Sequence, residues 1–75
     1  ATVVEVLFED SPGMLAAMSS AISSSGLNIA GLVLRTLSNS RGLVRFEVML
    51  ASIEDLHRLQ QHLERVQGVL QVERR

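Results

Sequence analysis

Residues 2–15 read Thr-Val-Val-Glu-Val-Leu-Phe-Glu-Asp-Ser-Pro-Gly-Met-Leu and carry the clearest structural signals in the chain. Residues 2–8 are mostly β-branched or apolar, which predicts a strand with two distinct faces. Ser11 and Pro12 are typical of a helix entry, because proline has no N–H group to leave unpaired at the first helical position. The stretch therefore predicts a strand followed directly by a helix.

Apolar residues at helical spacing follow this entry. Leu15, Met18 and Ile22 recur at intervals of three and four, which predicts a helix from Met14 to about Ser25. Gly26 is expected to end it, because glycine adopts the left-handed conformation at little steric cost. The remaining face of the helix is rich in serine, a weak helix former, so packing must stabilise it.

Two further strands are predicted in the middle of the chain. Residues 27–37 and 43–50 are apolar and β-branched, and the segment 38–42 between them is dense in turn formers. This arrangement predicts a β-hairpin.

A second helix and a last strand complete the pattern. Ser52 and Asp55 resemble a capping box, and leucines at helical spacing follow them. Gly68 is expected to close this helix. Alternation over residues 69–73 predicts a short strand with Leu70 and Val72 on the same side.

The predicted order is strand, helix, strand, strand, helix, strand. Right-handed crossovers fold this order into a four-stranded antiparallel sheet with both helices on one face. The sequence therefore predicts an α+β fold of the ferredoxin-like βαββαβ plan, as one domain over residues 1–75.

The second face of this sheet has no predicted cover. It is expected to carry Val3, Glu5, Leu7, Arg45, Glu47 and Met49. Such a mixed face is compatible with exposure to solvent, with Glu5 and Arg45 paired across neighbouring strands. The alternative, which we favour less, is a surface that contacts another domain.

Composition excludes several classes of function. The 75 residues include no cysteine, so neither a disulfide framework nor a thiolate metal site can form. The seven basic residues, all arginine, are spread along the chain and matched by eight acidic ones, which argues against direct nucleic-acid binding. No apolar run reaches the length of a membrane span and no charged leader is present, so a cytoplasmic location is expected.

The chain also lacks arrangements typical of catalysis. His57 and His62 are five residues apart, which places them roughly 140° apart on a helix and prevents them from binding one metal ion. Both are expected at the solvated surface. No nucleophile motif, phosphate loop or opposed pair of carboxylates is present, so we expect no catalytic residue, no metal and no cofactor. A chain of 75 residues without disulfides buries only a small hydrophobic core, so we also expect a homo-oligomer, in which a second copy adds stability.

The motif Asp10-x-Pro12-Gly13-x-Leu15, followed after about fifteen residues by Asn28-Ile29, resembles the signature of ACT domains. These are small regulatory modules that bind amino acids, and the resemblance covers essentially the whole chain. The ending with Gly68, Val69, Val72 and Arg74 is similar to the C-terminal ACT modules of RelA/SpoT-type enzymes, which make and hydrolyse guanosine tetra- and pentaphosphate. Similar endings occur in modules of amino-acid biosynthetic enzymes. The resemblance implies a non-catalytic module from the C-terminal end of a larger enzyme.

The loop chemistry suits the ligand that the resemblance implies. Backbone N–H groups at the start of the first helix favour a carboxylate, and Asp10 can hold an ammonium group. Asn28 offers both a donor and an acceptor. The expected ligand-binding residues are Asp10, Ser11, Gly13, Met14, Leu15, Leu27, Asn28 and Ile29. We expect them to meet at one hollow, with Met14, Leu27 and Ile29 around an aliphatic side chain. Each also has a structural interpretation as a cap, turn or core residue.

Two functions are compatible with these features. In the first, an amino-acid ligand binds between the loop after the first strand of one chain and the neighbouring chain. It shifts a homodimer, formed through the strand at 27–37 or through stacked helices, and the catalytic domain of the parent chain responds. In the second, the domain binds no ligand and acts as an interaction or dimerisation module.

Overall fold

All six predicted elements form, in the predicted order. The computed structural model describes residues 2–75. The strands are β1 (Thr2–Glu9), β2 (Ile29–Thr36), β3 (Arg41–Val48) and β4 (Val69–Arg74), and the helices are α1 (Met14–Ser24) and α2 (Ile53–Glu64).

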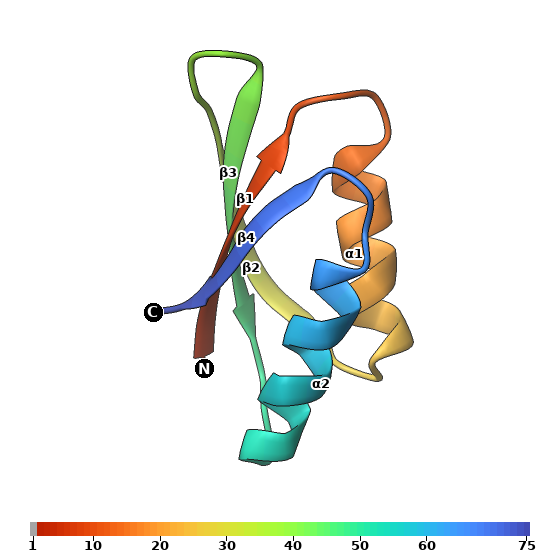
Figure 1. Cartoon of the computed structure of the whole chain (residues 1–75). Coiled ribbons are helices and arrows are strands. Elements are labelled where there is room, and N and C mark those ends of the chain that lie inside the picture. Colours follow the sequence, from red (N-terminus) through yellow and green to blue (C-terminus); the bar gives the residue numbers. More distant parts are fainter. Residues whose placement is uncertain (1) are drawn as a thin grey trace.

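The strands form one antiparallel sheet of four strands in the order β2-β3-β1-β4. Both helices lie on the same face of this sheet (Figure 1). The predicted ferredoxin-like α+β sandwich is therefore confirmed, and β1 is a central strand. The strands β2 and β4 are left at the edges.

The hydrophobic core fills the space between the sheet and the helices. Alternate residues of the central strands and residues three or four apart on each helix supply it. In α1 the buried residues are Met14, Met18 and Ile22, so the prediction is wrong for Leu15, which is 38% exposed. The buried apolar side chains are Val4, Val6, Phe8, Met14, Met18, Ile22, Val44, Phe46, Val48, Leu56, Leu59 and Leu63.

Gly42 makes room for one of these core side chains. It lies opposite Phe8 in the β1–β3 ladder, and a Cβ atom at this position would overlap the phenyl ring. The absence of a side chain at Gly42 therefore allows Phe8 to reach the core from the end of β1.

The two helices start in different ways. The Ser52 hydroxyl caps α2 by accepting from the Asp55 backbone N–H at 3.3 Å, and the Asp55 carboxylate accepts from the Ala51 N–H at 3.0 Å. The predicted capping interaction is confirmed, although Asp55 binds the residue before the cap. Gly13 occupies the cap position of α1 with φ of 85°, and no side chain caps this helix in the described part of the chain.

The helix ends also differ. Gly26 has φ of 79° and follows the end of α1, as predicted. Gly68 has φ of 101°, but α2 ends earlier, at Glu64. Gly68 therefore forms the turn into β4 and does not end the helix.

Two strand details differ from the prediction. The hairpin turn is tighter than expected, because Asn39 and Ser40 both adopt positive φ and β3 begins already at Arg41. In β4 the pairing register with β1 shifts next to Leu70, which leaves that side chain 44% exposed. The prediction that Leu70 shares a side with Val72 is therefore wrong, because a bulge interrupts the alternation.

Candidate functional site

The β1–α1 loop presents backbone donors at the amino end of α1. The Met14 N–H donates to the Ser11 carbonyl oxygen at 3.2 Å, and the Ala17 N–H donates to that of Gly13 at 2.9 Å. Among residues 2–75, no side chain caps the N–H groups between them. The Asp10 N–H donates to the Ser40 carbonyl oxygen at 2.8 Å, which ties this loop to the β2–β3 hairpin.

The charge around the two helix starts also differs. The first turn of α2 contains Glu54 and Asp55, which complement the positive end of the helix dipole. The first turn of α1 contains no acidic residue. The amino end of α1 therefore keeps its positive partial charge, and a carboxylate of a bound molecule would be favoured there.

The second part of the predicted site lies elsewhere in the same chain. Leu27, Asn28 and Ile29 follow the carboxyl end of α1, whereas Asp10 and Gly13 precede its amino end. A helix of 11 residues is about 16 Å long, and the two loops lie at opposite ends of α1 (Figure 1). Within a single chain these groups therefore do not share a hollow, and the expected site stays a prediction that involves a neighbouring chain.

Burial divides the predicted ligand-binding residues into two groups. Met14 is 6% exposed, and Leu27 and Ile29 are packed against the core. Met14 is therefore a core residue, whereas Leu27 and Ile29 are only partly buried. The exposed residues are Asp10, Ser11, Gly13, Leu15 and Asn28.

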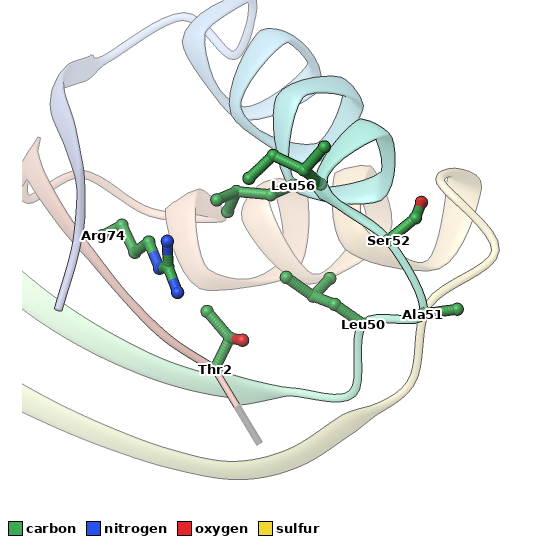
Figure 2. A pocket seen from close by; sticks show the side chains of 7 residues that line it. Thr2, Leu50, Ala51, Ser52, Leu56 and Arg74 are labelled. Atoms are coloured by element: carbon green, nitrogen blue, oxygen red, sulfur yellow. The ribbon is translucent and has the colours of Figure 1, made fainter.

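None of the described hollows within residues 2–75 is lined by a predicted site residue. One of them, of about 230 Å³, lies between the start of α2 and the start of β1, and Figure 2 shows Arg74 and Thr2 on neighbouring strands at its wall. It is lined by Thr2, Leu50, Ala51, Ser52, Ile53, Leu56 and Arg74.

The edge strand β2, which lies within the segment expected to pair two copies, carries an apolar surface. Leu32 and Leu34 lie opposite Phe46 and Val44, so they point to the helix side of the sheet. They are nevertheless 41% and 48% exposed, because they lie on the edge strand, beyond the helix-covered centre of the sheet. Within the part of the chain that the structure describes, no strand pairs with the outer side of β2.

The open face of the sheet contains a network around Glu5. The Arg45 Nη2 atom lies 2.7 Å from one Glu5 carboxylate oxygen, and the Arg75 Nε atom lies 2.8 Å from the other. Hydrogen bonds from Arg45 and then Arg75 hold the pKa of Glu5 below its ordinary value, although desolvation opposes them. The predicted Glu5–Arg45 pair is confirmed, and Arg75 is an additional partner.

One of the two histidines is not at the solvated surface. His57 is exposed, as predicted, but His62 is half-buried, with its Nδ1 atom 2.8 Å from the Ser25 hydroxyl oxygen. The prediction for His62 is wrong, because α1 packs beside α2 and covers this position.

Within residues 2–75 no group of three or more possible metal ligands occurs, and no helix has the length and apolarity of a membrane span.

Comparisons with known proteins agree with the fold of the chain. A family model described as ACT domain matches residues 1–74. A GTP pyrophosphokinase of Myxococcus xanthus is 37% identical over 71 residues, which are 95% of this chain and 9% of that protein. The chain therefore spans about a tenth of the length of this relative.

Solved structures show the same fold. The ACT domain from the GTP pyrophosphokinase of Chlorobium tepidum has a TM-score of 0.85 at 27% identity, covering 99% of this chain and 95% of that one. The small subunit of acetolactate synthase from Thermotoga maritima has a TM-score of 0.84 at 12% identity, covering 97% of this chain and 45% of that one, and supports the fold alone. From its family match, its fold and these relatives, the chain belongs to the ACT domain family and is similar to the ACT domains of GTP pyrophosphokinases.

Proposed function

We propose that this ACT domain is a regulatory module of a GTP pyrophosphokinase and binds an amino acid between two copies of itself. The observation that supports this proposal is that the loop with Asp10 and Gly13 and the loop with Asn28 are separated by the length of α1. A site that needs both loops must take them from different chains.

The β2 edge and the adjoining face of α1 support pairing of two copies. An unpaired edge strand offers backbone hydrogen bonds to a second strand. Leu32, Leu34 and the 38% exposed Leu15 would bury apolar surface on pairing. The serine and alanine side chains of α1 are small enough to let a second helix approach closely.

A two-fold axis across this edge would bring the separated loops together. Antiparallel pairing of two α1 helices places the amino end of each helix beside the carboxyl end of the other. Asp10 and Gly13 of one copy would then face Asn28 of the second copy, and the symmetry would create two equivalent sites.

The chemistry of the combined site fits a free amino acid. The uncapped N–H groups after Gly13 would bind its carboxylate, and Asp10 would bind its ammonium group. Asn28 of the second copy would donate to or accept from the same polar groups. The exposed part of Leu15 supplies an apolar contact that suits an aliphatic side chain.

Such a ligand would regulate through the pairing equilibrium. A molecule that contacts two copies binds the dimer more tightly than the monomer, so it shifts the population towards the dimer. An attached catalytic domain that makes or hydrolyses guanosine tetra- and pentaphosphate could respond to this shift.

The test uses calorimetric titration with a panel of amino acids against the domain and the Asp10→Ala and Asn28→Ala variants. Each variant alone is expected to lose binding, whereas the control Glu9→Ala, a neighbouring exposed acid, is expected to keep it. An equimolar mixture of the two variants should recover about a quarter of the wild-type sites, because half of the dimers then contain one intact site. No recovery in dimers that still form would contradict a site shared between copies.

One observation favours a second function. The single chain has no described hollow at the predicted site, and Met14, Leu27 and Ile29 are occupied in its core. These facts are compatible with a module that binds no ligand. It would act only through pairing of two copies or through contacts of the open face of its sheet, where Glu5 lies. Absence of heat from every amino acid, together with unchanged dimerisation, would support this function.

A further inference from the structure

Ser25 and His62 connect the two helices by hydrogen bonds at the end where Asn28 lies. Ser25 follows the last residue of α1 and is 7% exposed. Its hydroxyl oxygen lies 3.0 Å from the Ala21 carbonyl oxygen and 2.8 Å from the Nδ1 atom of His62. His62 belongs to the last turn of α2.

The direction of these two hydrogen bonds follows from the number of protons. The serine hydroxyl has one proton, and the Ala21 carbonyl oxygen can only accept, so the hydroxyl donates to it. The same oxygen must then accept from His62, which places a hydrogen on Nδ1. His62 therefore acts as a donor to a buried hydroxyl.

The segment after Ser25 leads directly to Asn28. Gly26 turns with φ of 79°, and its N–H donates to the Ser23 carbonyl oxygen at 2.9 Å. Leu27 and Ile29 pack against the core on either side of the exposed Asn28. The path of this turn is thus set by the hydrogen bonds at Ser25 and by the two apolar anchors.

We propose that His62 is a positioning residue for the amino-acid site. Through its hydrogen bond to Ser25 it fixes the turn between α1 and β2 and so orients the Asn28 side chain towards the second copy. This inference rests on the proposed function, because it assigns Asn28 to the ligand. A side chain already fixed in its binding orientation loses less conformational freedom when the ligand binds.

A purely structural role for His62 is the competing explanation. A basic residue in the last turn of a helix also interacts favourably with the helix dipole. The two explanations predict different amino-acid affinities for variants in which another residue replaces His62. In His62→Asn the amide nitrogen lies near the position of Nδ1, whereas in His62→Gln it lies near that of Nε2.

The experiment measures amino-acid affinity by calorimetry for His62→Ala, His62→Asn, His62→Gln and Ser25→Ala. The control is His57→Ala, which removes an exposed histidine from the same helix. We expect His62→Ala, His62→Gln and Ser25→Ala to weaken binding about fivefold, the effect of one ordinary hydrogen bond. His62→Asn should bind within about twofold of the wild type, and His57→Ala should not differ from it.

Equal affinity of His62→Ala and His57→Ala would overturn the inference, as would failure of His62→Asn to restore binding. A wild-type domain that binds no amino acid would instead contradict the proposed function. In that case, amide hydrogen exchange of residues 26–29 tests whether His62 fixes the turn that contains Asn28. Faster exchange there in His62→Ala than in His57→Ala supports the role of His62, and equal exchange overturns it.

Discussion

Glu5 is a charged residue that is buried on the open face of the sheet. It lies on the open face of the sheet, yet its side chain is only 7% exposed, because guanidinium groups from β3 and from Arg75 lie against it. Arginine suits this position, because its planar group can donate several hydrogen bonds to one carboxylate.

This network makes folding stability depend on pH. Since the pKa of Glu5 is lowered in the folded state, the unfolded chain binds a proton at higher pH than the folded chain does. The stability contributed by Glu5 is therefore complete above the ordinary glutamate pKa of about 4.3 and falls as pH decreases through the folded value. Urea unfolding between pH 7 and pH 3 should show Glu5→Gln destabilised at neutral pH, with the difference from wild type shrinking on acidification. Glu64→Gln, an exposed residue of α2, should show no such pattern.

Gly42 gives a second prediction at a single residue. In Gly42→Ala the new methyl group would overlap the ring of Phe8, so we expect a loss of about 1–3 kcal/mol in the free energy of unfolding. Gly31→Ala is the matched control, because its methyl group would meet only the flexible Glu47 side chain. Equal unfolding midpoints for the two variants would contradict this role of Gly42.

At the scale of the elements, the two helices are stabilised differently. The helix α2 has a capping hydroxyl and acidic residues in its first turn, whereas α1 has neither and contains several serines. The amino end of α1 is thus available to a ligand, and its stability depends on the packing of Met18 and Ile22 in the core.

This difference predicts opposite effects of serine replacement. Ser52→Ala removes the cap of α2 and should destabilise the domain by about 1 kcal/mol in thermal or urea unfolding. Ser20→Ala, at an exposed position of α1, should leave stability unchanged or raise it by a few tenths of a kcal/mol, because alanine favours helix. A loss in Ser20→Ala as large as that in Ser52→Ala would contradict this assignment.

At the scale of the whole molecule, the sheet ends at an apolar edge that the helices leave open. The side chains of Leu32 and Leu34 are on the side of the core but only half covered. Contiguous apolar surface beside an unpaired strand is typical of an interface.

Leu34→Lys should therefore weaken pairing of two copies. Burial of a leucine side chain is worth about 1.5–3 kcal/mol, so the dissociation constant of the dimer should rise at least about tenfold. Sedimentation velocity over a range of concentrations measures it. Leu70→Lys, a similarly exposed leucine on the opposite edge strand, is the control. Equal effects of the two variants would place the interface elsewhere.

The order of the elements, the core face of β1 and the cap of α2 could all be predicted from the sequence. These features depend on residues a few positions apart, whose spacing matches the period of a strand or helix. The same local signals identified the exposed donors at the start of α1. The ACT motif residues could be found in this way, because the motif is itself defined by short spacings.

Only the tertiary structure decided which distant groups meet. It paired Glu5 with Arg75, 70 positions away, and Ser25 with His62, 37 positions away, and it separated Asp10 from Asn28 by the length of α1. The bulge that exposes Leu70 is likewise a property of the β1–β4 register. Such contacts depend on the direction in which each helix returns the chain and on the alignment of neighbouring strands, and no local spacing contains that information.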